Sequence, residues 1–359
     1  MPGGLHPPIE VLKEWAARDH SHIETRGWGL VVVTLLMSLL TFATLVARLW
    51  ARLVIQRNAG LDDLIITIAA VPTFGLAVAI CLAGRIYGFD RHAWDLTPAD
   101  AIKTRKVAMA IEALYIMCTG LIKISILLFY RRMSEGSVTP VFRWAVRACI
   151  AFVIAYIITF EVTLFLGCRP ISVFWNQVNP FWVHEHPDFK CFNEAANLLA
   201  ASAFSIIQDF IACGMPLILF WKLQLPFRQK VVLAAIFGVG FFTCITSIIR
   251  IVYIYRLFYV TYDVTWVAGE IWLWTGVEAH VAIICASAPA LKAFFRQYFS
   301  ASALYSWRQK TGTTSSSAIK KDVELGTIEV TREFDVSATP VSRHSSQERL
   351  AASSSQARW

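Results

Sequence analysis

Charged side chains are scarce in this sequence: only 16% of its 359 residues are Asp, Glu, Lys or Arg, whereas 56% are hydrophobic. Since roughly a quarter of the residues of a soluble domain are charged, this composition excludes an ordinary soluble protein and indicates a membrane protein. The first 27 residues contain charges throughout and no apolar core, so we expect no cleavable signal peptide. The net charge of +8 does not indicate nucleic-acid binding, because most basic residues flank hydrophobic runs.

Known catalytic and cofactor motifs are also missing. The sequence has no HExxH, no GxSxG and no aspartate-rich prenyl-diphosphate motif, so we predict no catalytic residue. No lysine lies between Val267 and Leu291, which excludes a retinal Schiff base on the last hydrophobic run. We expect no cofactor and no metal site, because loop histidines such as His184 and His186 are more often solvated than metal-bound.

Seven hydrophobic runs are long enough to cross a bilayer, which takes about 20 residues. They lie at about 28–50, 61–84, 107–130, 143–167, 195–221, 231–257 and 267–291. Basic residues concentrate after the first, third and fifth runs, where Glu135 is the single acid. By the positive-inside rule these loops are cytosolic. We therefore predict an all-α protein, a seven-transmembrane helix bundle with its N-terminus outside and its C-terminus in the cytosol.

The sequence divides into three parts. Residues 1–27 form a short extracellular segment, residues 28–293 form the membrane domain, and residues 294–359 form a cytosolic region. The cytosolic region begins with the alternating aromatic and basic residues AFFRQYF, which are typical of an amphipathic helix on the inner leaflet. From about Ser300 onward the chain is rich in Ser, Thr and charge, so we predict a disordered tail.

The third run carries two opposite charges within the bilayer, Glu112 and Lys123. On a helix they share one face but lie about 16 Å apart, so each needs a partner on another helix or in a polar cavity. Lys123 has a depth similar to that of Asp62 and Asp63 at the start of the second run, so we expect a salt bridge to one of them. The alternative for both aspartates is helix capping.

Further charged residues lie inside the other runs. Asp209 is in the middle of the fifth run, where inserting a carboxylate costs roughly 2.5–3.5 kcal/mol, so it must face the interior of the bundle. A polar cavity that binds a ligand is one interpretation of the remaining group, and interhelical ion pairs that hold the bundle together are the other. This group comprises Glu112, Glu161, Arg250, Glu278 and His280.

A second polar group is expected at the cytosolic ends of the helices: Asp62, Asp63, Lys123, Arg131 and Arg132. Rearrangement of this network on ligand binding could expose a surface to a cytosolic signalling partner. The residues FYRR at 129–132 occupy the place of the Asp/Glu-Arg-Tyr switch of many receptors, but they lack its acid.

The eight cysteines fall into two groups. Cys168 and Cys191 lie outside the hydrophobic runs and face the oxidising side, so we predict a disulfide between them. The other six lie within the runs and are expected to be buried thiols.

Short motifs follow one another through all seven runs. They are Gly60-Leu61-Asp62-Asp63; Tyr87-Gly88; Arg91-His92; Trp94-Asp95-Leu96; Lys123; Ser125; Leu128-Phe129-Tyr130-Arg131-Arg132; Cys168, Pro170, Trp175 and Cys191; Asp209 and Pro216; Ser247 and Arg250; Asp263 and Thr265; and Trp274, Glu278 and Pro289. In this ordered set, residues 25–295 resemble the fungal rhodopsin-like integral membrane domain family. The resemblance implies a seven-helix, receptor-like membrane protein. The sequence departs from some relatives because residues 1–27 contain no cysteine and thus no cysteine-rich outer domain.

The leading interpretation is a receptor-like protein of the plasma membrane. It would contact the lipid bilayer, bind a small or lipophilic ligand from the outer side and relay the signal to a cytosolic partner. An intramembrane cyclase is the first alternative, in which buried acids protonate a polyprenyl-derived substrate and aromatic rings stabilise a carbocation. A proton-coupled transporter is the second, although the first three and last three runs show none of the similarity that such folds often have.

Overall fold

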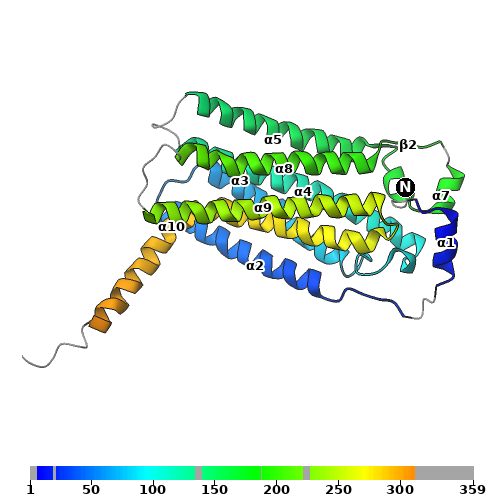
Figure 1. Ribbon diagram of the computed structural model, residues 1–359, viewed down its shortest axis with the longest axis horizontal. Helices are drawn as coiled ribbons and strands as arrows, with labels where there is room; N and C mark the ends of the chain where they lie inside the picture. The colour runs from blue at the N-terminus through cyan, green and yellow to red at the C-terminus, as the bar shows by residue number, and fades with distance from the viewer. Residues whose placement is uncertain (1–5, 19–21, 134–139, 187, 221–226, 312–359) are drawn as a thin grey trace, which may run out of the picture. The chain divides into compact units, whose positions relative to one another are not determined.

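The computed structural model describes residues 6–18, 22–133, 140–186, 188–220 and 227–311, and these are almost entirely helical (Figure 1). Within these ranges, seven helices are long and apolar enough to cross a membrane. They are α2 (Gly29–Trp50), which continues into the π-helical turn η1 (Ala51–Ile55), α3 (Leu61–Ala83), α4 (Pro98–Met133), α5 (Pro140–Leu166), α8 (Glu194–Phe220), α9 (Phe227–Tyr259) and α10 (Val264–Thr311). The prediction of an all-α, seven-span membrane protein is confirmed, whereas its orientation in the membrane stays a prediction.

The predicted cytosolic region falls in two parts of the structure. Residues 294–311, which begin with the expected amphipathic segment, continue α10 as a helix. The tail predicted to be disordered begins at about Ser300, so its first positions are part of this helix, and residues 312–359 lie outside the described residues.

The second span shows how the sequence starts and ends a helix. Asp62 and Asp63 lie in the first turn of α3, where carboxylates complement the helix dipole. The Asp63 carboxylate also accepts a hydrogen bond from the backbone N–H of Gly60 at 3.1 Å. After the helix ends, Gly88 adopts a φ of +83°, a conformation that favours glycine and turns the chain into the loop towards α4. Capping is thus one of the functions of Asp63.

α4 and α10 are the most enclosed spans. In their most apolar windows 56% and 61% of the residues are buried, against 22–33% in the other five spans. The exposed positions of the other spans are large and apolar, as for Leu39 on α2 and Val78 on α3, which suits contact with lipid chains. Lys123, within the apolar part of α4, is 6% exposed and lies in the interior of the bundle, whereas Lys103 and Lys106 near the start of the helix are exposed.

One end of the bundle carries the disulfide, and we call it the disulfide end. The two short strands β1 (Cys168–Arg169) and β2 (Lys190–Cys191) pair antiparallel, with Cys168 opposite Cys191. These two cysteines form the disulfide, which confirms the prediction, and the other six are free thiols. The short helices α1 (Ile9–Ala16) and α7 (Pro180–Glu185) also lie at this end (Figure 1). The helix α6 (Val173–Asn176) contacts β1, and the 3-10 turn η2 (Ala93–Asp95) lies in the loop between α3 and α4.

Candidate functional site

A cavity of about 590 Å³ lies at the disulfide end. Its wall is formed by α1, by the loop between α3 and α4, and by the turns of α4, α8, α9 and α10 that lie nearest the disulfide end. Most of the lining is apolar and much of it aromatic, with Trp15, Trp94, Phe258 and Trp272 as examples. This size and composition are typical of a site for a small organic molecule.

The N-terminal helix α1 forms one side of this cavity, and we call it the roof. Ile9, Leu12, Trp15 and Ala16 line the cavity, and their spacing of three or four residues places them on one face of the helix. The ring of Trp15 contacts that of Trp94 with centroids 5.8 Å apart. The amphipathic pattern of this short helix therefore has a partner surface on the membrane domain.

A stack of five planar groups holds the roof to the bundle. The His92 ring lies between those of Trp94 and Trp266, with centroid distances of 4.3 and 4.0 Å. The Arg18 guanidinium covers the outer face of Trp94 at 4.2 Å, and that of Arg26 covers Trp266 at 4.3 Å. Such cation–π contacts contribute about 0.5–1 kcal/mol each at exposed sites. We call this set the aromatic stack; it joins the N-terminal segment, the first loop and α10.

Asp263 fixes the central ring of the aromatic stack. Its carboxylate lies 2.5 Å from Nδ1 of His92 and accepts the backbone N–H of Ala93 at 2.9 Å. The Thr265 hydroxyl donates to the carbonyl oxygen of Arg91 at 2.9 Å. The motif residues that carry the family resemblance in this region thus join the loops at the disulfide end.

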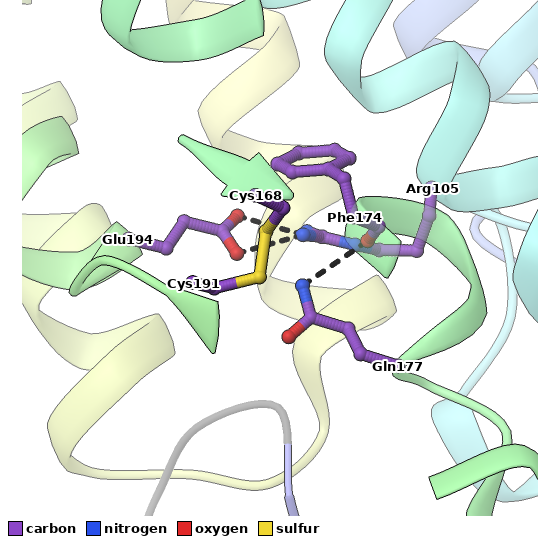
Figure 2. The surroundings of a disulfide bond; sticks show 6 residues. All are labelled: Arg105, Cys168, Phe174, Gln177, Cys191 and Glu194. Atoms are coloured by element: carbon purple, nitrogen blue, oxygen red, sulfur yellow. Dashed lines mark hydrogen bonds and ion pairs between the residues drawn. A yellow bond between two sulfur atoms is a disulfide. The ribbon is translucent and has the colours of Figure 1, made fainter. Parts of the chain in front are cut away.

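A second ion pair lies beside the disulfide (Figure 2). Nη2 of Arg105 on α4 contacts both carboxylate oxygens of Glu194 at the start of α8, at 2.9 and 2.7 Å. The guanidinium also stacks on Phe174, whose carbonyl accepts a hydrogen bond from Gln177 at 3.1 Å. Sequence reasoning missed this pair, because 89 residues separate its members and no local pattern connects them.

His6 lies next to this ion pair at the edge of the cavity. Partial burial lowers the pKa of the imidazole, and the positive charge of Arg105 lowers it further, while Glu194 and a hydrogen bond with Gln177 oppose the change. The segment just before the roof therefore carries a neutral imidazole at neutral pH.

Glu112 lies on α4 at the floor of the cavity. It lines the large cavity and also a small one of about 50 Å³, of which Arg250 forms part of the wall. Its buried Oε2 has no hydrogen-bond partner among the described residues. Of the five residues predicted to line a polar cavity, Glu112 is the one that reaches the large cavity.

Arg250 and Glu278 form a buried ion pair below this floor. Nε of Arg250 lies 2.9 Å from the Glu278 carboxylate, and the two side chains are 5% and 3% exposed. The Tyr115 hydroxyl donates to Glu278 at 2.5 Å and accepts from Arg250 at 2.5 Å. Ser202 accepts a further hydrogen bond from Arg250 at 3.0 Å. This group joins α4, α8, α9 and α10.

Lys123 and Asp209 form the next buried pair along the bundle, with Nζ and Oδ1 3.0 Å apart. Lys123 also donates to the Ser205 hydroxyl at 2.9 Å, and Ser247 donates to Asp209 at 2.9 Å. Ser205 lies 3.4 Å from the Tyr115 hydroxyl, so the two pairs belong to one network. We call this set, from Arg250 to Asp209, the central polar network.

The predicted bridge from Lys123 to Asp62 or Asp63 is therefore wrong. A similar depth in the membrane is not enough for contact, because Lys123 points towards α8 rather than α3. The two aspartates instead pair with arginines at the opposite end of the bundle from the disulfide.

We call these charged groups the arginine cluster. Arg48 on α2 is 1% exposed and lies 3.1 Å from Asp62 and 2.9 Å from Asp63. Its Nη1 donates to the carbonyl oxygen of Ala286 on α10 at 2.5 Å. Arg132 at the end of α4 lies 3.0 Å from Asp62. The cluster thus ties α2, α3, α4 and α10 together.

Two further arginines lie at this end. Arg52, one turn beyond Arg48, lies 3.5 Å from Asp63. Arg131 is half-buried beside Arg132, which supplies the contact to Asp62. Arg48 and Arg52 are among the basic residues at the end of the first hydrophobic run, and their spacing of four residues, which places them on one face of a helix, was the available signal.

His280 and Glu161 are not among the residues that line the cavities described above. The His280 ring is 1% exposed and lies 3.2 Å from the Ser38 hydroxyl and 3.0 Å from that of Thr41, both on α2. Glu161 lies on α5, and its buried Oε1 has no partner among the described residues. The predicted group of five therefore separates into a cavity residue, an ion pair and two residues that lie elsewhere.

The described part of the chain contains no cluster of three or more His, Cys, Asp or Glu side chains able to hold a metal ion. The groups of this site that could act on a ligand are the apolar cavity, the Glu112 carboxyl group and the adjoining network of paired charges.

Comparison with known proteins places this architecture in a family. A family model described as the fungal rhodopsin domain matches residues 47–297. Receptor GIN3 of Arthrobotrys oligospora is 30% identical over 260 residues, which cover 70% of this chain and 58% of that protein. A SAT4 family membrane protein of Emericella nidulans is 26% identical over 245 residues, 67% of this chain and 59% of that protein.

A third relative, the fugralins biosynthesis cluster protein 2 of Gibberella zeae, is 22% identical over 222 residues, 61% of this chain and 54% of that protein. The matched region thus spans less than two thirds of the length of each of these relatives. Because the family model covers more than half of the chain and includes the central polar network, the arginine cluster and most of the cavity wall, the chain belongs to the fungal rhodopsin domain family.

Proposed function

We propose that this protein is a membrane receptor that binds a lipophilic molecule in the cavity of about 590 Å³ and responds by changing the packing at the arginine cluster. One observation carries the proposal. α10 contributes Trp272 to the cavity, Glu278 to the central polar network and the Ala286 carbonyl to the arginine cluster. A single helix thus connects the proposed binding site with the opposite end of the bundle.

The cavity supports binding of a molecule that is apolar over most of its surface. Its lining is mainly hydrophobic, and the charged residues Arg105 and Glu194 at its edge neutralise each other. Burial of apolar surface is worth about 25 cal/mol per Å², so a ligand that buries about 300 Å² gains roughly 7 kcal/mol before the costs of association. A ligand of this type needs few polar contacts.

The central polar network supports the proposed response. Buried hydrogen-bonded groups have few alternative arrangements, because an unpaired buried charge is costly. A ligand that displaces Trp272 shifts α10 and thereby the contacts of Glu278 with Arg250. The network then changes from one paired arrangement to another, which is the two-state element that a relay requires.

The proposal places the disulfide end outside the cell and the arginine cluster at the cytosolic face of the plasma membrane. The supporting observations are the positive flank formed by Arg48, Arg52 and Arg132 and the disulfide at the opposite end. A ligand then enters from outside, next to the roof, and a cytosolic signalling partner contacts the end of the bundle with the arginine cluster. The Arthrobotrys relative, Receptor GIN3, supports the same class.

A thermal-shift screen of lipophilic metabolites on the protein in nanodiscs tests the proposal. Ala268 is 6% exposed and lines the cavity, so Ala268→Phe fills part of it; Val78→Phe on the exposed face of α3 is the matched control. We expect a ligand to stabilise the wild type and Val78→Phe but not Ala268→Phe, and to change hydrogen exchange of the backbone around Ala286. Equal stabilisation of all three proteins would show that the cavity is not the binding site.

A second candidate function is an intramembrane cyclase. The observation in its favour is the Glu112 carboxyl group at the floor of an apolar cavity with aromatic walls, where a general acid could meet a carbocation-forming substrate. The Gibberella relative, fugralins biosynthesis cluster protein 2, agrees with this alternative. Mass spectrometry of the bound compound distinguishes the two: a receptor returns the ligand unchanged, whereas a cyclase returns an isomer, and Glu112→Gln abolishes its formation.

A further inference from the structure

We infer that the ligand of this cavity is a lipophilic alcohol, whose neutral hydroxyl binds between Glu112 and Trp272 while its apolar body fills the cavity. The inference rests on the proposed function and names the ligand class of the same site. It is carried by two buried polar atoms that the protein itself leaves without partners.

These atoms are Oε2 of Glu112 and Nε1 of Trp272, neither of which makes a hydrogen bond within the described part of the chain. The Trp272 side chain belongs to a residue that is only 6% exposed. Both residues line the large cavity and the small one next to it. Because buried donors and acceptors in native proteins are almost always paired, this acceptor and this donor point to a polar group supplied from outside the chain.

The space between the two residues suits a compact head group. The small cavity measures about 50 Å³, enough for one or two water molecules or for a group of similar size. Arg250 lies in its wall, but its guanidinium already contacts Glu278, Ser202 and Tyr115. The positive charge at this end of the cavity is thus compensated, and an anionic head group gains little from it.

The numbers of hydrogen-bond donors and acceptors in each type of head group then determine which type fits this space. A hydroxyl has one donor and two acceptor lone pairs, so it can donate to Glu112 and accept from the Trp272 indole at the same time. An ammonium group only donates and leaves the indole N–H without a partner. A carboxylate only accepts, so it can pair with Glu112 only when that group is protonated, and its own charge would be buried without a free cation beside it. A hydroxyl also fits Glu112 in either protonation state, because it can reverse the direction of that hydrogen bond.

The rest of the cavity requires an apolar body. Phe89, Leu257, Phe258 and Ile271 lie in its wall near Trp272, and none of them offers a side-chain hydrogen bond. Polar groups in the body of the ligand would lose their hydration here without compensation. The combination of one hydroxyl and a hydrocarbon skeleton defines the ligand class.

Four probes with one skeleton test the head group: 2-naphthylmethanol, 2-naphthylmethylamine, 2-naphthoate and 2-methylnaphthalene. The full-length protein is labelled with ¹⁵N-tryptophan in nanodiscs, and the indole resonance of Trp272 is assigned by its loss in Trp272→Phe. Empty nanodiscs correct each titration for partition into lipid. Glu112→Leu removes the acceptor, and Glu161→Leu is the matched control, because Glu161 is another acid with a buried, unpaired oxygen but does not line either cavity.

We expect the alcohol to shift the Trp272 indole resonance and to bind about tenfold more tightly than the hydrocarbon, the factor for one well-placed hydrogen bond. This preference disappears in Glu112→Leu and persists in Glu161→Leu. If Glu112→Leu does not fold, Trp272→Phe provides the second test, since it removes the donor and should reduce the same preference.

The other outcomes overturn the inference without deciding the proposed function. Preference for the amine would show that the site takes a cation, and equal binding of all four probes would show that the small cavity holds water only; in both cases the large cavity still binds a ligand. Binding of none of the probes also overturns the inference. The metabolite screen with Ala268→Phe then decides the proposed function separately.

Discussion

The pairing of Lys123 with Asp209 gives the sharpest test of the structure, because the sequence alone favoured a different partner. Lys123→Met removes the cation and leaves the Asp209 carboxylate without its ion pair in the interior. At the separation of 3.0 Å between Nζ and Oδ1, the Coulomb energy with an effective dielectric constant of about 20 is roughly 5.5 kcal/mol. Loss of one partner of such a pair typically costs about 3–5 kcal/mol, and we expect a loss of this size in the free energy of unfolding.

A double-mutant cycle separates the pair energy from other effects of the substitutions. Asp209→Leu alone should also destabilise, because it leaves the ammonium group unpaired, whereas Lys123→Met with Asp209→Leu should recover at least about 2 kcal/mol of the summed losses. The matched cycle combines Lys123→Met with Asp63→Asn, and its energies should add within about 0.5 kcal/mol, since these residues belong to different clusters.

Equilibrium unfolding in mixed micelles, followed by tryptophan fluorescence, measures these energies. Coupling between Lys123 and Asp63, together with additivity between Lys123 and Asp209, would refute the assignment of partners on which the central polar network depends. Lys123→Arg offers a further check, because it keeps the charge and should retain more stability than Lys123→Met.

Three other predictions address the ends of the bundle. The double variant Cys168→Ser with Cys191→Ser opens a loop of 23 residues and should lower the free energy of unfolding by about 3 kcal/mol. In a thermal melt, a reducing agent should lower the melting temperature of the wild type to that of the double variant and should leave the double variant unchanged. Docking of the roof should weaken as the pH falls below about 6.5, the ordinary pKa of histidine. The pKa of His6 is lowered in the docked state, so the undocked state binds a proton more readily. The contribution of His6 to docking is therefore full above about pH 6.5 and decreases as the pH falls towards the lowered pKa. Hydrogen exchange of α1 between pH 5 and 7.5 measures this pH dependence, and His6→Gln should abolish it. Arg48→Met leaves Asp62 with Arg132 at 3.0 Å and Asp63 with contacts of 3.5 and 3.6 Å to Arg52 and Arg132, and it should cost about 3 kcal/mol. Arg143→Met, at an exposed position, should be nearly neutral; equal melting temperatures of the two variants would contradict the role of the arginine cluster.

The features that could be predicted from the sequence depend on length, composition or local spacing. A run of about 20 apolar residues can do little but cross a bilayer as a helix, so all seven spans could be located, although α4 begins nine residues before the predicted run and α10 continues twenty residues beyond it. Cys168 and Cys191 were the two cysteines outside these runs, which left one partner for each. Asp62 and Asp63 at a helix start indicated capping, and the contact of Asp63 with Gly60 agrees.

The features that could not be predicted from the sequence depend on the rotation and packing of helices that are distant in the sequence. Depth alone paired Lys123 with the wrong acids, because depth does not say which neighbour a helix face meets. Arg105 and Glu194 look like ordinary loop-flanking charges until the fold places them together. A cavity is an absence of side chains between several elements, so no local pattern in α1 or α10 could reveal it.

The roof has a consequence for the timing of any response. Since α1 and the aromatic stack close one side of the cavity, a molecule entering or leaving past the roof must wait until this segment opens, and such local opening takes microseconds to seconds. If the roof is closed equally well over an empty and a filled cavity, it slows entry and exit by the same factor and leaves the equilibrium affinity unchanged. After a short exposure to ligand, the cavity then stays occupied for longer than the exposure lasted. The stability of the docked eight-residue helix sets this residence time.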